Sequence, residues 1–96
     1  MKQFGHTFST HGAGAKNTRK LQGRAAGTGQ SQGQFLDNQK AADFLSQHSG
    51  ITKPTDVSLP SGLGQIVRPD GSISAASKVR LIPNGNGGFR SAFPVD

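Results

Sequence analysis

Two histidines near the N-terminus are the residues best suited to acid–base chemistry in this sequence. His6 and His11 both lie within residues 4–12, in a chain that has no cysteine. An unperturbed imidazole titrates near pH 6.5, so a pair of imidazoles can act as acid and base together near neutral pH. We expect residues 4–12 to form a strand that holds His6 between two phenylalanines on one face. A turn at residues 10–12 would then bring His11 to His6.

Other kinds of catalytic site find little support in the sequence. A zinc site lacks ligands, since there is no cysteine and the first acidic residue, Asp37, follows His11 at a distance. A serine hydrolase would need a Gly-x-Ser-x-Gly motif, and a glycosidase would need paired carboxylates in a chain that lacks glutamate. We therefore expect neither a metal nor a cofactor.

Cleavage of RNA without a metal fits the residues that are present. One group takes the proton of the ribose 2′-OH, a second gives a proton to the departing 5′ oxygen, and cations stabilise the charge on the phosphorus. His6 and His11 can supply the two proton transfers, with arginines and hydroxyl groups from later strands around the phosphate. Such a reaction would leave 2′,3′-cyclic phosphate ends and would continue in EDTA.

The charge distribution also points to a polyanionic partner. Eleven basic and five acidic residues give a net charge of +6. Two basic blocks flank a nearly neutral middle. The first consists of Lys2, Lys16, Arg19, Lys20 and Arg24 before Asp37, and the second of Arg68, Lys78, Arg80 and Arg90 in the last third. A nucleic acid is the commonest partner for such a surface. The alternatives are a merely soluble basic surface and affinity for anionic lipid. Against lipid, the sequence has no amphipathic basic helix and no apolar run of membrane-spanning length.

The first half of the chain, residues 1–50, is predicted to contain helices after the short strand. A helix would begin at Asn17 or Thr18 and end at Gly27, with Leu21 and Ala25 on its buried face. Residues 27–34 would form a polar, glycine-rich connector that contacts RNA. A second helix would span residues 37–47, with Asp37 as its N-cap and Ala41, Phe44 and Leu45 as its buried stripe. His48 would interact with the dipole at the end of that helix.

The second half, residues 57–96, is predicted to form an antiparallel meander. Its strands would be joined by turns at residues 69–71 and 83–88. In the run 73–82, Val79 and Leu81 would face the core, with cations on the other face. The last strand would place Phe89, Ser91, Phe93 and Val95 on one face and Arg90 on the other. Helices followed by a twisted antiparallel sheet predict a single α+β domain over residues 1–96.

Four segments of the chain resemble a known family of toxins. They are residues 6–12 (HTFSTHG), 23–45 (GRAAGTGQSQGQFLDNQKAADFL), 64–72 (GQIVRPDGS) and 92–95 (AFPV). Together they resemble the C-terminal toxin domains of contact-dependent growth inhibition and related polymorphic toxin systems. Within that group the likeness is to ribonucleases of the barnase, EndoU, colicin and RelE-like fold.

The resemblance implies a function and a set of partners. Such a domain is released from a secreted or cell-surface protein, acts in the cytoplasm of a neighbouring cell and cleaves RNA, most often tRNA. Its partners would be the RNA, a cognate acidic immunity protein and, as a further candidate, a factor of the host cell; the isolated domain would have no membrane partner.

The resemblance also implies roles for individual residues. The candidate catalytic residues are His6, His11, Arg68, Arg90 and Ser91. As RNA-binding residues the resemblance implies Lys78 and Arg80, and the charge distribution adds Lys16, Arg19, Lys20 and Arg24. Two alternatives stay open: a non-catalytic basic module that binds nucleic acid, and a structural or secretion-linked domain of a large surface protein.

Overall fold

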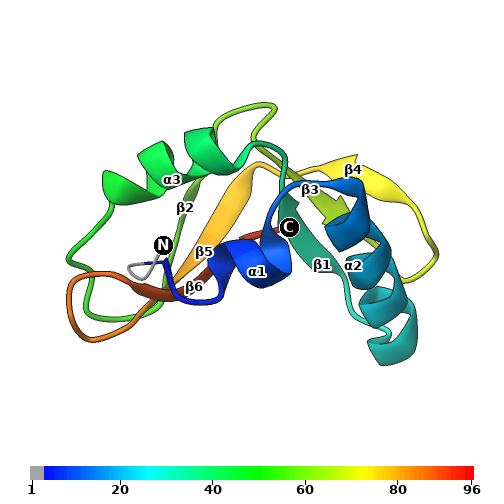
Figure 1. The fold of residues 1–96 in the computed structure, drawn as a ribbon, viewed down its shortest axis with the longest axis horizontal. Helices are drawn as coiled ribbons and strands as arrows, with labels where there is room; N and C mark the ends of the chain where they lie inside the picture. The colour runs from blue at the N-terminus through cyan, green and yellow to red at the C-terminus, as the bar shows by residue number, and fades with distance from the viewer. Residues whose placement is uncertain (1–3) are drawn as a thin grey trace.

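The computed structural model describes residues 4–96, which fold into three helices and six strands (Figure 1). In chain order the elements are α1 (Thr7–His11), α2 (Ala15–Thr28), β1 (Gln32–Phe35), α3 (Asn38–Ser46), β2 (Thr55–Ser58), β3 (Gly64–Val67), β4 (Ile73–Ala75), β5 (Lys78–Pro83) and β6 (Phe89–Val95). Helices and antiparallel sheets together confirm the predicted α+β class.

The strands form two antiparallel sheets of three strands, so the prediction of one meander was wrong. The strand orders are β1-β3-β4 and β2-β5-β6. The predicted run 73–82 divides at residues 76–77, where neighbouring residues bond to different sheets. The Ala76 N–H donates to the Gly64 carbonyl of β3, whereas the Ser77 carbonyl accepts from the Leu59 N–H just after β2. An apolar run does not reveal such a change of partner, because each half is a normal strand.

β1 lies in the segment that was predicted to be a connector, so that prediction was wrong from Gln32 onward. β1 pairs with β3 and also packs against β6. A β-carbon on Gly33 would lie 1.9 Å from the Pro94 carbonyl oxygen of β6, so only glycine fits there. The polar residue Gln34 is fully buried with hydrogen-bond partners of its own. Neither residue carries the apolar alternation by which strands are usually predicted.

The predicted N-terminal strand is a turn followed by the short helix α1. Gly5 adopts a left-handed conformation with φ of +54°, and the helix begins two residues later. The rings of Phe4 and Phe8 still contact each other, with their centroids 5.5 Å apart. Residues four apart share a face in a helix and in a strand alike, so the phenylalanine spacing did not distinguish the two.

The other two helices were predicted in the correct places. α2 buries Leu21 and Ala25 as expected, although it begins earlier than predicted and continues past Gly27 to Thr28. Gly29, with φ of +71°, is its C-cap. In α3 the Asp37 carboxylate accepts a hydrogen bond of 2.9 Å from the Lys40 N–H, which confirms the predicted N-cap.

A β-bulge in β6 changes which residues share a face. Pro83 pairs with Phe89 and Ile82 pairs with Ser91, so Arg90 is an extra residue in the strand. Phe89 therefore lies in the core together with Ala92, whereas Phe93 is only half-buried. The predicted grouping of Phe89 with Phe93 was wrong, because simple alternation does not anticipate a bulge.

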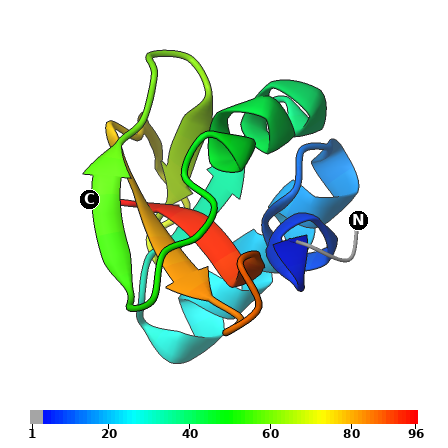
Figure 2. The ribbon, with the colours of Figure 1, turned by 90° about the vertical axis from the view of Figure 1, so that its left-hand side faces the viewer.

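β6 runs through the middle of the molecule and connects its parts (Figure 2). It pairs with β5 and contacts β1 of the other sheet, and α1 packs beside it. α1 also contacts α2 and β1. The C-terminal residue of α1 thereby comes to lie where the two sheets meet.

Candidate active site

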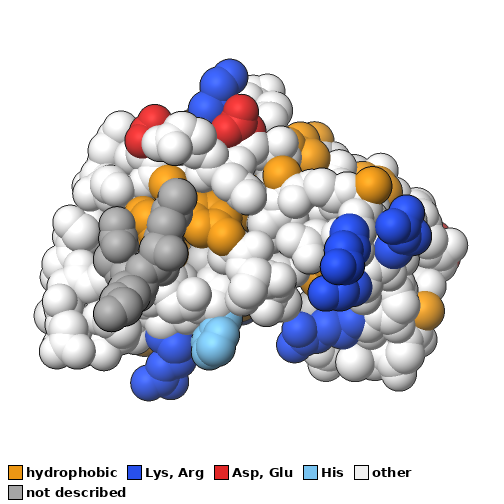
Figure 3. All heavy atoms as spheres, viewed as in Figure 1, with side chains coloured by type: hydrophobic (Ala, Val, Ile, Leu, Met, Phe, Trp, Pro, Cys, Tyr) orange, Lys and Arg blue, Asp and Glu red, His pale blue; other side chains and the backbone are white. Residues whose placement is uncertain are grey.

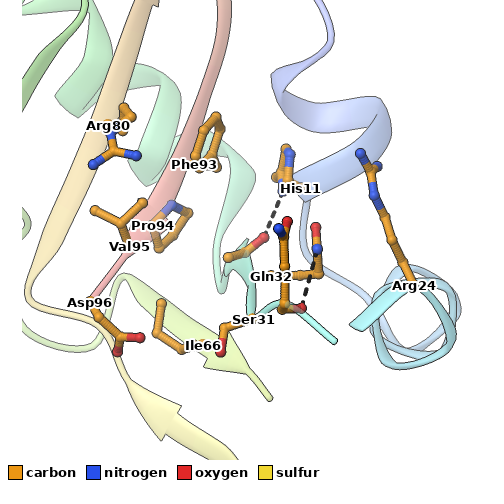
Figure 4. A pocket seen from close by; sticks show the side chains of 12 residues that line it. His11, Arg24, Ser31, Gln32, Ile66, Arg80, Phe93, Pro94, Val95 and Asp96 are labelled. Carbon is orange, nitrogen blue, oxygen red and sulfur yellow. Dashed lines mark hydrogen bonds between the residues drawn. The ribbon is translucent and has the colours of Figure 1, made fainter. Parts of the chain in front are cut away.

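A cavity with a volume of about 420 Å³ lies at this junction (Figure 4). α1, α2, β1, β3, β5 and β6 all contribute to it. Its walls consist of His11, Arg24, Gln30, Ser31, Gln32, Gly33, Ile66, Arg80, Phe93, Pro94, Val95 and Asp96. We call it the His11 cavity.

His11 is the titratable imidazole of this cavity and is held in one orientation. It is only 8% exposed, and its Nδ1 lies 2.7 Å from the Gly33 carbonyl oxygen. A carbonyl can only accept a hydrogen bond, so Nδ1 carries the proton of the neutral ring and Nε2 is the free acceptor. The Phe93 ring packs 5.1 Å away, measured between ring centroids.

The surroundings of His11 favour its neutral form. Burial lowers the pKa of His11 below its usual 6.5, and the positive charge of Arg24 lowers it further, while the hydrogen bond to Gly33 opposes both effects. A neutral imidazole with a free Nε2 can accept a proton at pH 7.

Gln34 fixes the chain on either side of His11. Its Nε2 donates to the carbonyl oxygens of Gly12 at 3.0 Å and Gly14 at 3.2 Å. Its Oε1 accepts hydrogen bonds from the Thr18 hydroxyl at 2.9 Å and from Nε2 of Gln65 at 2.8 Å. One buried amide thus connects the segment after α1 with α2, β1 and β3.

The cavity carries two arginines in different electrostatic situations. Arg80 makes a bidentate ion pair with Asp56, with distances of 2.9 Å from Nε and 3.2 Å from Nη2, and this pair lowers the pKa of Asp56. Arg24 has no acidic partner among residues 4–96. Its side chain extends from α2 toward the end of α1 that carries His11 (Figure 4). Arg24 is therefore the cation that an anionic ligand can contact without breaking an ion pair.

Arg68, a predicted catalytic residue, lies beside the cavity in a second ion pair. Its Nη2 donates to Asp96 at 2.8 Å and to the Ser74 hydroxyl at 2.9 Å. Asp96 is one of the cavity residues, whereas Arg68 is not. Arg68 positions a carboxylate at the rim in this structure.

His6 lies at the other end of α1 from His11. It is an exposed residue in the turn before the helix, and its N–H donates to the Arg90 carbonyl oxygen at 2.9 Å. A helix advances about 1.5 Å and turns about 100° per residue, so residues five apart point in different directions. The bend that was expected to join the two imidazoles does not form, and His6, Arg90 and Ser91 are not among the described residues that line the cavity.

The predicted RNA-binding residues of the first basic block lie together on α2. Basic side chains gather over this helix in the space-filling view (Figure 3). Lys16, Arg19, Lys20 and Arg24 are all exposed, and none of them pairs with an acid within residues 4–96. Arg80 of β5 lines the cavity, whereas the exposed Lys78 at the start of the same strand does not. Of the predicted RNA-binding residues, Arg24 and Arg80 therefore line the same cavity as His11.

Sequence reasoning missed three residues that shape the site: Gly33, Gln34 and Phe93. Gly33 and Gln34 stand in a Gly- and Gln-rich stretch that is typical of a connector, and Phe93 was grouped with core residues. The only sequence signal for Phe93 was the alternation of apolar residues in the last strand. The bulge at Arg90 shifts that alternation, so it pointed to the wrong face.

Comparison of the chain with protein-family models, curated proteins and solved structures gives no match. Within residues 4–96, no three histidine, cysteine or acidic side chains are grouped so that they could hold a metal ion. None of the helices that the structure describes is long and apolar enough to cross a membrane.

Proposed function

We propose that this chain is a metal-independent endoribonuclease with the His11 cavity as its active site. The observation that carries the proposal is the combination of a fixed imidazole, Nδ1 bonded to Gly33 and Nε2 free, with Arg24 and Arg80 in the same cavity. This combination supplies a base for the ribose hydroxyl and cations for the phosphate.

In the proposed reaction, Nε2 of His11 takes the proton of the 2′-OH. The 2′ oxygen attacks the adjacent phosphorus, and the bond between phosphorus and the 5′ oxygen breaks. The departing 5′ oxygen receives a proton from solvent or from the His11 imidazolium. Arg24 and Arg80 stabilise the extra negative charge on the phosphate. The products carry a 2′,3′-cyclic phosphate and a 5′-hydroxyl, and His6 has no role in this scheme.

The exposed face of α2 supports RNA as the substrate. Lys16, Arg19, Lys20 and Arg24 offer four cations to a phosphate backbone, and Arg24 connects that face with the cavity. The finer proposals, that the RNA is tRNA, that the chain is a toxin of bacterial competition and that an acidic immunity protein inhibits it, rest on the family resemblance of the sequence.

The test is to incubate total RNA with the purified protein in EDTA. We expect discrete fragments from the wild-type protein and from the His6→Ala and His48→Ala variants, and intact RNA from His11→Ala. The other two histidines are matched controls because neither lines the cavity. Fragments from His11→Ala at the wild-type rate would remove His11 from the mechanism.

A non-catalytic RNA-binding module is the second candidate, and the unpaired cations on α2 favour it. Such a module would shift RNA in a gel without cutting it, and the shift would weaken as salt rises. Intact but shifted RNA with the wild-type protein would therefore replace the enzyme proposal with this one.

A further inference from the structure

The His11 cavity has one apolar wall, which the proposed proton transfer and phosphate contacts do not use. Phe93, Val95 and Ile66 lie on one side of the cavity, opposite Gln32 and Arg24 (Figure 4). Phe93 is half-buried, so part of its ring is open although it also packs against His11. Cleavage of a phosphodiester needs cations and proton-transfer groups. It does not explain why an aromatic ring lies partly exposed beside them.

The opposite, polar side of the cavity carries groups that can form hydrogen bonds with the edge of a planar ligand. Gln30, Ser31 and Gln32 lie side by side in the chain just before and at the start of β1, and all three line the cavity. Gln32 Nε2 makes a long hydrogen bond of 3.4 Å to the Gln30 carbonyl, so its amide is held only loosely in this structure. Carboxamides both donate and accept hydrogen bonds, as the edges of nucleobases do.

We propose that the His11 cavity binds one unstacked nucleobase, with the base face on Phe93 and its edge toward Gln30 and Gln32. The phosphate next to this base would then lie toward Arg24, which is on the same side of the cavity as Gln32 (Figure 4). The volume of about 420 Å³ is within the usual range of small-ligand sites. A base stacks on an aromatic ring through its π-face, and single-stranded RNA exposes bases for this purpose. The inference rests on the proposed function for its substrate class, but its first test does not require cleavage.

The first test uses tryptophan fluorescence, because the sequence contains no tryptophan and no tyrosine. In the Phe93→Trp variant, AMP, GMP, CMP and UMP are titrated in turn, with ribose 5-phosphate as the probe that lacks a base. We expect saturable quenching by at least one nucleotide and no saturable change with ribose 5-phosphate.

The matched control is Phe44→Trp. Phe44 also packs against a histidine, His48, with ring centroids 4.8 Å apart, but it lies on α3 outside the cavity. Equal quenching in both variants, or none in Phe93→Trp, would overturn the proposal. If circular dichroism shows that Phe93→Trp does not fold, the same nucleotides are titrated into the unmodified ¹⁵N-labelled protein. Saturable shifts of the Gln32 and Phe93 amides would then support the proposal, and their absence would overturn it.

The second test asks whether the same ring contacts RNA during cleavage. Phe93→Ala should lower kcat/KM on a short RNA by roughly 5- to 150-fold, the equivalent of about 1–3 kcal/mol of stacking. On an RNA that lacks the base at the cleaved nucleotide, Phe93→Ala should cause no further loss. An equal loss on both RNAs would show that Phe93 only supports His11. Nucleotide binding without any cleavage would contradict the proposed function and leave the base site intact.

Discussion

His11 is held in the cavity by one backbone hydrogen bond and one aromatic ring. Its Nδ1 donates to the Gly33 carbonyl and its ring packs on Phe93, so the free Nε2 has a defined position. The same burial that fixes the ring lowers its pKa. A residue placed in this way can accept a proton near neutral pH. Its protonation should also change the free energy of unfolding with pH.

We predict that His11 makes the folded state less stable in mild acid. The folded chain binds this proton less readily than the unfolded chain, since the pKa of His11 is lowered on folding. Below pH 6.5 the unfolded state takes up the proton first, so the free energy of unfolding falls with pH until the folded pKa is passed. The slope from this one group is at most about 1.4 kcal/mol per pH unit.

Urea unfolding between pH 7.5 and 5 measures this effect. The difference in the free energy of unfolding between the wild-type protein and His11→Gln should change with pH. If the free energies of unfolding of the wild-type protein and His11→Gln change in parallel with pH, the lowered pKa of His11 is contradicted.

Gln34 is the second residue whose replacement should be diagnostic. It is 1% exposed, and its amide bonds to Gly12, Gly14, Thr18 and Gln65. Gln34→Ala leaves several of these groups without partners and should lower the free energy of unfolding by about 1–3 kcal/mol. Gln39→Ala is the control, because Gln39 makes a single exposed hydrogen bond to Asp43. Thermal unfolding compares the two, and similar small losses would show that the Gln34 bonds contribute little.

At the scale of elements, amphipathic helices were predictable and the short elements were not. Leu21, Ala25, Ala41 and Leu45 follow helical spacing, so their burial could be predicted. α1 has only five residues, too few to show a period that differs from that of a strand. β1 depends on the close approach of the Gly33 backbone to Pro94 and on the hydrogen bonds of the buried Gln34 side chain. A hydropathy pattern reports neither feature.

α2 is the element that should control RNA affinity. Replacing Lys16, Arg19 and Lys20 by glutamine removes three exposed cations from one helix without touching the cavity residues. We expect weaker RNA binding and a salt dependence whose slope falls by about 2, since each phosphate contact to single-stranded RNA contributes about 0.7. Fluorescence anisotropy of a labelled RNA at several salt concentrations measures both quantities.

The control for α2 is the pair Lys40→Gln and Lys53→Gln, which removes exposed charge from other parts of the chain. This pair should leave most of the affinity and the slope unchanged. If it weakens binding as much as the α2 variant does, the attraction is a property of net charge rather than of the helix.

At the scale of the whole molecule, the site exists because two small sheets meet at β1 and β6. The α+β class could be read from the order of helices and strands in the sequence. The junction could not, because it depends on the change of sheet at residues 76–77 and on the bulge at Arg90. His11 was found as a candidate from its residue type and its nearness in sequence to His6, whereas its partners Gly33, Phe93 and Arg24 come together only in the folded chain.

The most direct measurement is the chemistry of the RNA ends that the purified protein leaves in EDTA. Mass spectrometry of a short RNA after incubation should show 2′,3′-cyclic phosphate and 5′-hydroxyl ends with the wild-type protein and with His6→Ala. His11→Ala should leave the RNA intact under the same conditions. Intact RNA with the wild-type protein, or the same ends produced by His11→Ala, would contradict the role of His11 as the base of a ribonuclease.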